Sequence, residues 1–254
     1  MERILKHELT ENQAALWFLG QSGFIIKSAG VTVAIDPYLS DSAATISPQL
    51  ARRFPPPIEP AELKVDIYIA THDHLDHLDP ETLAGYRHKK TTMFVGPRFV
   101  CEKLVALGVR PQNIERIDSG ETKVVNSVQL SGIYAVANDP EVIDTAGYKI
   151  VFTNGRSVYH TADTGFSTLL LQCAPSAEVG LFVINGKWGN LNVEQAAELA
   201  GRVNPRYAIP HHYDLMRINS ENPETFKYQV KFINQRIEVK ILKPMRPFVW
   251  GDRT

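Results

Sequence analysis

The chain begins with short apolar stretches that turn residues separate. Residues 14–18, 24–27 and 31–35 are rich in apolar and β-branched side chains, and glycine and serine lie between them. Apolar stretches of this length with turn residues at their ends are typical of short strands. The pattern predicts a meander of three strands at the start of the fold.

Farther along the chain, apolar stretches of strand length alternate with longer stretches that have the spacing of helices. Asn154 and Gly155 are a favourable hairpin turn pair, and Asn192 with Gln195 resembles a capping box at the start of a helix. Periodicity therefore predicts a mixed α and β fold. The expected strands cover 65–70, 92–95, parts of 122–136, 147–152, 157–160, 180–184 and 206–209, and the expected helices cover 79–86, 97–107, 192–202 and 223–235.

The densest group of potential metal ligands follows the expected strand 65–70. It comprises His72, His74, Asp76 and His77, and an N-cap aspartate and a proline directly afterwards begin a helix. Residues i and i+2 at the end of a strand project to the same side, so His72 and His74 can converge on one cation. The chain then turns, so Asp76 and His77 can face a second cation. Imidazole and carboxylate groups suit zinc and other first-row divalent metals.

The charge and the apolar content narrow the classes of function. The chain has 27 Lys and Arg residues against 28 Asp and Glu residues, and this balance predicts no bulk attraction to nucleic acid or to a membrane. No apolar run approaches the roughly 20 residues that a membrane span needs, and the charged N-terminus lacks the apolar region of a signal peptide. Cys101 and Cys173 form no disulfide framework and are expected to be small buried residues. A cytoplasmic location is expected.

The pattern His-x-His-x-Asp-His after a strand resembles the signature of the metallo-β-lactamase superfamily. Three other segments, 33–37, 159–164 and 208–213, resemble further motifs of that superfamily. The resemblance extends from Trp17 to about Trp250, which is nearly the whole chain.

Within the superfamily, residues 16–23 and 35–42 are most similar to the branch that contains L-ascorbate-6-phosphate lactonase. The resemblance implies an α/β fold, the four-layer αββα sandwich of the metallo-β-lactamase type, with residues 1–254 as a single hydrolase domain. It also implies a centre for one or two divalent ions, zinc or manganese. By this resemblance His72 and His74 belong to the first metal site, Asp76, His77 and His212 belong to the second, and Asp163 bridges both.

Two positions depart from the pattern of the superfamily. The segment 135–140 lacks the histidine that usually completes the first metal site. Asp139 is the candidate oxygen ligand in its place, whereas neutral Asn138 is a poor zinc ligand. This replacement is expected to weaken the first site or to favour a harder ion such as manganese. Gln21 stands where many relatives carry histidine, and it is expected either to form a hydrogen bond near the metals or to act only as a turn residue.

Residues beside the expected ligands receive supporting and substrate-binding roles. Asp36 is expected to hydrogen-bond a metal-binding histidine rather than to bind the metal itself. Asp76 and His160 are the expected catalytic residues, and a contact of His160 with substrate or with a ligand is favoured over a packing role. The candidates for substrate binding are His211, Tyr213 and Lys187, with Arg217 near them.

The segment 40–64 is rich in serine at its start and contains three consecutive prolines at 55–57. Such a segment cannot form a central strand. It is expected to be a plain linker or else a loop with a short helix around 48–53 that lies over the mouth of the active site.

These observations together predict a metal-dependent hydrolase that opens a small ester or lactone, including a sugar-phosphate lactone, with a metal-bound hydroxide. The alternatives are a metal-dependent phosphodiesterase and a non-catalytic relative that binds or senses metal. The expected partner is a small molecule, anionic ones included, rather than nucleic acid or a membrane, and a homo-oligomer is compatible with the sequence.

Overall fold

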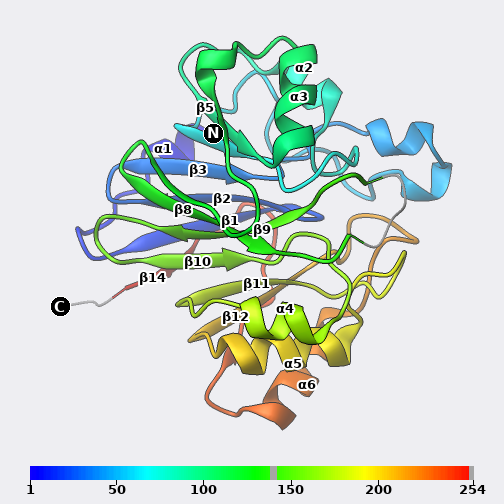
Figure 1. The fold of residues 1–254 in the computed structure, drawn as a ribbon. Coiled ribbons are helices and arrows are strands. Elements are labelled where there is room, and N and C mark those ends of the chain that lie inside the picture. The colour runs from blue at the N-terminus through cyan, green and yellow to red at the C-terminus, as the bar shows by residue number, and fades with distance from the viewer. Residues whose placement is uncertain (138–141, 252–254) are drawn as a thin grey trace.

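The computed structural model describes residues 1–137 and 142–251. Two mixed sheets of seven strands face each other, and helices cover the outer faces of the pair (Figure 1). This is the four-layer αββα sandwich that the superfamily resemblance implies, so the expected fold class is confirmed.

The first sheet combines the N-terminal meander with parallel strands. Its first three strands pair antiparallel in chain order, and the next three continue the sheet in parallel. A strand near the C-terminus pairs with β1 and forms the opposite edge. In spatial order the strands are β14 (Phe248–Trp250), β1 (Ala14–Gly20), β2 (Gly23–Ser28), β3 (Val31–Ile35), β4 (Ile67–Ile69), β5 (Met93–Gly96) and β6 (Ile114–Arg116).

The second sheet has the same plan. An antiparallel meander at one edge leads into strands that pair in parallel toward the other edge. In spatial order its strands are β13 (Glu238–Val239), β12 (Tyr207–His211), β11 (Val179–Val183), β10 (Ser157–His160), β9 (Ala146–Val151), β8 (Val128–Tyr134) and β7 (Thr122–Val125).

Three layers of buried apolar side chains hold the sandwich together. Phe24 and Tyr148 belong to the layer between the sheets. Leu104 belongs to the layer between the first sheet and its helices, and Phe226 to the layer between the second sheet and its helices. Each large apolar side chain buried in this way stabilises the fold by about 1.5–3 kcal/mol. The α-helices are α1 (Glu2–Leu5), α2 (Pro80–Gly85), α3 (Arg98–Ala106), α4 (Thr168–Cys173), α5 (Val193–Val203) and α6 (Pro223–Ile233).

The local signals read from the sequence act as expected. The Asp79 side chain accepts a hydrogen bond from the backbone N–H of Glu81 at the start of α2. Asn192 and Gln195 form both hydrogen bonds of a capping box at the start of α5. Gly155, in the turn between β9 and β10, has a φ of 81°, which favours glycine.

Several short elements were not expected from the sequence. They are α1, α4 and the strands β6, β13 and β14, the strands having only two or three residues each. Such short stretches carry too few residues to show a period, and their sheet partners decide their conformation. A 3₁₀ helix, η3 (Pro111–Asn113), precedes β6. The two cysteines are free, but Cys101 is only half-buried and Cys173 is exposed, so the expectation that both are buried is wrong.

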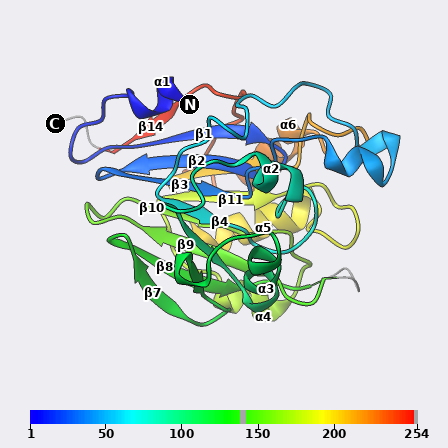
Figure 2. The same cartoon turned by 90° about the horizontal axis from the view of Figure 1, so that it is seen from above.

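The segment between β3 and β4 lies at one end of the sandwich. It contains two short 3₁₀ helices, η1 (Ser42–Thr45) and η2 (Pro48–Leu50), near the short helix expected at 48–53. Figure 2 shows these blue turns projecting from the same end as the yellow loop that follows β11. Among the described residues, no helix has the length and apolar character needed to cross a membrane.

Candidate metal centre

The potential ligands lie where parallel strands end. The loop after β4 carries the histidine cluster, Asp36 directly follows β3, Asp163 follows β10, and His212 follows β12. Because β3 and β4 are parallel, as are β10 and β12 through β11, their carboxyl ends meet at common edges of the sheets. Side chains at such edges are the usual source of a binding site in folds with parallel strands.

His77 is held by Asp36. The Nδ1 atom of His77 donates to Asp36 Oδ2 at 2.7 Å, and both side chains are fully buried. The backbone N–H and the hydroxyl of Thr71 also donate to the Asp36 carboxylate, each at 2.8 Å. This arrangement fixes the ring of His77 and leaves its Nε2 atom free to face the other ligands.

His72 and His74 converge as expected for alternate residues at a strand end. His72 Nε2 lies 3.0 Å from His74 Nδ1, and His72 Nδ1 lies 3.0 Å from the Thr71 hydroxyl. His72 is buried, and burial followed by the charge of His77 holds the pKa of His72 well below its usual value. A neutral imidazole is the form that binds a metal.

Asp163 lies between the histidines of the two sheets. Its Oδ1 atom is 2.8 Å from His212 Nε2 and 3.4 Å from His77 Nε2, and Asp76 Oδ1 is 3.8 Å from the same His77 atom. Three groups of potential ligands have atoms within 4.8 Å of one another: His72, His77 and Asp163; Asp76, His77 and His212; Asp163, His211 and His212.

Three buried polar atoms that face one another fit a cation. His77 Nε2 and His212 Nε2 both approach Asp163 Oδ1, and among the described residues none of the three atoms has a hydrogen-bond partner outside this group. One carboxylate oxygen is thus shared by two buried imidazole nitrogens. A divalent ion would satisfy imidazole and carboxylate groups together.

Amide side chains orient the second group of ligands. Gln21 Nε2 donates to Asp76 Oδ2 at 3.0 Å and lies 2.9 Å from His212 Nδ1. Asn219 Oδ1 lies 3.1 Å from the same His212 atom, and Asn219 Nδ2 donates to Asp76 Oδ2 at 3.3 Å. Asn190 Nδ2 donates to Asp163 Oδ2 at 2.7 Å. Gln21 therefore makes hydrogen bonds at the centre and is more than a turn residue.

Sequence reasoning missed Asn190, Asn219 and Thr71. Asn190 follows the end of the parallel strand β11, and this position was a usable signal. Asn219 lies in the loop after β12, where no pattern distinguishes it from an exposed amide.

The backbone at the centre is strained at five non-glycine residues. Positive φ angles occur at Gln21 (53°), Asp36 (46°), Ala162 (60°), Trp188 (48°) and His212 (61°). Each such residue costs of order 1–3 kcal/mol, and residues of this kind cluster at functional sites. The fold maintains this strain at the ends of several different strands.

Charges at the centre shift its pKa values in opposite directions. Burial disfavours the charged form of His77, yet the carboxylates of Asp163, Asp36 and Asp76 outweigh it and hold the pKa of His77 well above its usual value. Burial likewise lowers the pKa of His212, but the carboxylate of Asp163 outweighs burial, so the pKa of His212 is raised. Burial raises the pKa of Asp163, but His212 and His77 outweigh this effect and hold it well below the usual value. The carboxylates of the cluster therefore favour positive charge at this point, as a cation site requires.

A cavity of about 350 Å³ opens beside the ligand cluster. His74, Asp76 and Asp163 line it together with Ala43, Ile46, Ser47 and Leu50 of the segment 40–64. The segment is therefore more than a plain linker, and it lies at the site as the expected loop with a short helix would.

The chain also matches a family of known proteins. A family model described as "Beta-lactamase superfamily domain" matches residues 32–213 of the chain, a span that contains His72, His77, Asp163 and His212. The chain belongs to the metallo-β-lactamase superfamily. The superfamily resemblance noted in the sequence is thereby confirmed, whereas the lactonase branch is not specifically shown.

Relatives of this superfamily protein carry one recurring description. A UPF0173 metal-dependent hydrolase from Methanopyrus kandleri is 29% identical over 237 residues, covering 89% of this chain and 96% of its own. A UPF0173 metal-dependent hydrolase from Staphylococcus saprophyticus is 27% identical and covers 90% of this chain and 96% of its own. Among solved structures, Igni18, a metallo hydrolase from Ignicoccus hospitalis, has a TM-score of 0.77 at 21% identity, covering 95% of this chain and 100% of its own.

His160, an expected catalytic residue, does not line the cavity. Its ring is fully buried, its Nε2 atom donates to the backbone oxygen of Ser22 at 3.0 Å, and its Nδ1 atom accepts from the N–H of Ala162 at 3.0 Å. Both nitrogens are thus engaged, and the ring lies in the layer between the sheets rather than at the cavity. Its role in this superfamily protein is to hold the turn before Asp163.

His211 and Tyr213, the residues expected to bind substrate, are both buried, and neither lines the cavity. His211 stacks on His160 with ring centroids 4.7 Å apart, and one of its nitrogens lies within 4.8 Å of ligand atoms of Asp163 and His212. Tyr213 stacks on Phe18 at 4.9 Å, and its hydroxyl donates to the backbone oxygen of Leu242 at 2.6 Å. The Tyr213 side chain points into the core because the packing of the sheets, and not the adjacent ligand, decides its direction.

Lys187, Asn138 and Asp139 are the remaining candidates. Lys187 is exposed, and together with Arg217 it lines a shallow depression that shares Trp188 and Ile218 with the cavity, so its contact with substrate stays a prediction. Asn138 and Asp139, the expected substitutes for the missing histidine, lie outside the described residues.

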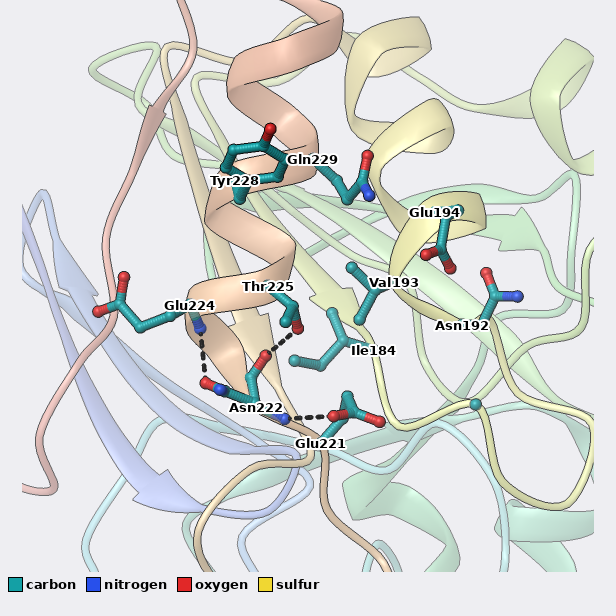
Figure 3. A pocket seen from close by; sticks show the side chains of 11 residues that line it. Ile184, Asn192, Val193, Glu194, Glu221, Asn222, Glu224, Thr225, Tyr228 and Gln229 are labelled. Carbon is teal, nitrogen blue, oxygen red and sulfur yellow. Dashed lines mark hydrogen bonds between the residues drawn. The ribbon is translucent and has the colours of Figure 1, made fainter.

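A larger hollow of about 470 Å³ lies between α5 and α6 (Figure 3). It shares no lining residue with the cavity, and its polar residues Asn192 and Asn222 accept hydrogen bonds from the first turns of the two helices. Three glutamates line this hollow, but no histidine is among its described lining residues. The ligand chemistry therefore belongs to the smaller cavity.

Proposed function

We propose that this protein is a metal-dependent hydrolase that opens a small ester or lactone. The observation that carries the proposal is the convergence of His77 Nε2, His212 Nε2 and Asp163 Oδ1, three buried atoms with no hydrogen-bond partner outside their own group, beside a cavity that a small molecule can enter. Relatives that cover about nine-tenths of the chain are named metal-dependent hydrolases, which supports the same activity here.

The chain's own residues would divide the work as follows. His72 and His74 would hold one divalent ion, Asp76, His77 and His212 would hold a second, and Asp163 would contact both. When bound, such an ion supplies a Lewis acid that polarises a carbonyl and lowers the pKa of a water molecule toward about 7.

Supporting residues would keep these ligands in place during the reaction. Asp36 and Thr71 hold the His77 ring, while Gln21 and Asn219 hold Asp76 and His212. Asp76, the one expected catalytic residue that lines the cavity, would accept a proton at its Oδ1 atom, because Gln21 and Asn219 already donate to its Oδ2 atom. Positions fixed in this way reduce the reorganisation that the reaction requires.

The proposed ions are zinc or manganese, since imidazole ligands suit zinc and an oxygen-rich site favours manganese. Similarity to the L-ascorbate-6-phosphate lactonase branch supports a lactone as the substrate. The closest rival is phosphodiester hydrolysis, which a pair of metal ions also supports.

A metal-reconstitution assay tests the proposal. The protein stripped with a chelator is loaded with zinc or manganese and offered a panel of lactones, aryl esters and bis-p-nitrophenyl phosphate. We expect metal-dependent turnover of a lactone or ester that His212→Ala abolishes, while His88→Ala, outside the centre, keeps full activity.

The same panel contains the outcomes that contradict the proposal. Faster hydrolysis of the phosphodiester than of every carbonyl substrate would establish the rival activity. Stoichiometric metal binding without turnover of any substrate in the panel would favour a non-catalytic metal-binding protein.

A further inference from the structure

The lining of the cavity combines the polar ligands with apolar side chains. Beyond the ligands, the lining side chains are mainly apolar and include Ile46, Leu50, Trp188, Met216 and Ile218. None of the described residues that line the cavity is a lysine or an arginine. A substrate bound here therefore meets apolar surface next to the reacting group.

Two of these apolar side chains are exposed to a degree that the fold does not explain. Ile46 is 70% exposed and Trp188 is 52% exposed, yet both line the cavity. Large apolar side chains gain free energy when they leave water, roughly in proportion to the area covered. A ligand with apolar surface would supply that cover.

The backbone at Trp188 points to the same conclusion. Trp188 (φ 48°) and Gly189 (φ 80°) are the central residues of a turn in which the N–H of Asn190 donates to the oxygen of Lys187 at 2.9 Å. Two positive φ angles in such a turn favour glycine, asparagine and aspartate. A tryptophan at this position strains the turn, and its indole gains little from packing while half of it is exposed.

The turn is also tied to the ligands. Asn190, its last residue, donates to Asp163 Oδ2 at 2.7 Å. The strained turn therefore fixes the indole relative to the carboxylate that is proposed to contact both metal ions.

Positive charge lies outside the cavity. Lys187 and Arg217 line the neighbouring depression, and Trp188 and Ile218 stand between that depression and the cavity. A phosphate attached close to the reacting carbonyl would face apolar walls rather than these cations.

We infer that this cavity selects carbonyl substrates that carry an uncharged alkyl or aryl group beside the scissile bond, in preference to phosphorylated sugars. The inference rests on the proposed function and names its class of substrate. Ile46, Leu50 and Trp188 form the apolar side of the site, and Trp188 is the residue that determines specificity.

A series of γ-lactones with lengthening alkyl side chains tests this selectivity in the zinc-loaded protein. Comparison of γ-valerolactone, γ-heptalactone and γ-nonalactone is expected to show kcat/KM rising about 3- to 5-fold per added methylene, until the cavity is full. Trp188→Gly is expected to reduce the advantage of the longest lactone over the shortest by about tenfold or more. Because glycine adopts the positive φ of this turn without strain, the variant is expected to fold. Phe232→Ala, at an 83% exposed position on α6, is the matched control and should leave the series unchanged.

Calorimetry with two hydroxamates separates this inference from the proposed function. Hexanohydroxamate should bind the zinc-loaded protein more tightly than acetohydroxamate by about tenfold or more, and Trp188→Gly should remove most of the difference. No lactone turnover together with this chain-length effect would overturn the proposed function, while the preference of the cavity for an alkyl group on its ligand would stand. Equal affinities for the two hydroxamates, or a higher kcat/KM for a phosphorylated sugar lactone than for the alkyl lactones, would overturn the inference.

Discussion

Asp36 and His77 are 41 residues apart in the sequence, and their side chains form a buried hydrogen bond of 2.7 Å. Asp36 directly follows β3 and has a strained φ of 46°, while His77 lies in the loop between β4 and α2. The strain has a structural reason, because it turns the carboxylate toward Thr71 and His77 at the shared edge of two parallel strands.

Replacing Asp36 with alanine should lower metal affinity by roughly 10–100-fold, the usual cost of losing a residue that orients a ligand. The reason is that His77 keeps its Nε2 atom but loses the partner that fixes its ring. Competition with a chelating dye measures the affinity. Asp66→Ala serves as the control, since Asp66 accepts a hydrogen bond from the N–H of Thr32 at a distance from the centre. An affinity equal to that of the unmodified protein would show that Asp36 has no supporting role.

His77→Ala and His212→Ala should each remove one equivalent of metal and reduce hydrolysis by more than about 100-fold, beyond the cost of losing a supporting residue. His77 belongs to two of the three ligand groups, so its loss should also weaken binding of the remaining ion. Elemental analysis of the purified variants gives the stoichiometry, with His88→Ala as the control. Full metal content in either ligand variant would remove that histidine from the centre.

Asp163→Asn should weaken both metal ions together, because one carboxylate is proposed to contact both. Asn190→Ala, which removes only the donor to Asp163 Oδ2, should produce a smaller loss of the same kind. Titration calorimetry resolves the two binding steps. Loss of a single step in Asp163→Asn would show that this carboxylate serves one ion and not two.

Metal binding should release protons and should strengthen as the pH rises. The folded protein raises the pKa of His77 and His212, so the stability that these groups give the metal-free protein is fully present below their unfolded pKa of about 6.5 and is lost as the pH rises through their raised values. Asp163 has a lowered pKa, so its contribution is present above about pH 3.9 and is lost only in acid. The metal-free protein should therefore lose stability above about pH 6.5, and the increase in Tm on metal binding should grow over the same range.

Thermal melts with and without metal between about pH 5 and pH 9 measure this difference. Calorimetry in buffers of different ionisation enthalpy counts the protons released. An increase in Tm that does not depend on pH, with no protons released, would contradict the charge balance described for His77, Asp163 and His212.

The sequence by itself determined the ligand types and the elements that carry them. The spacing of His72, His74, Asp76 and His77 after an apolar strand is a local property, and a strand end places alternate side chains on one side whatever the rest of the fold does. Capping residues such as Asn192 act through neighbours three residues away and are equally readable.

Only the tertiary structure decided which neighbouring residues reach the site. His160 and Tyr213 stand close to expected ligands in the sequence, but the packing of two sheets face to face turns their rings into the core. Asn219 reaches Asp76 across 143 positions of sequence, a contact that no local pattern encodes. The role of Trp188 was equally unreadable, because its exposure and its backbone strain arise from a turn that the surrounding strands hold in place. Local chemistry specifies the ligands, whereas long-range packing specifies the side chains that support them and the walls that face the substrate.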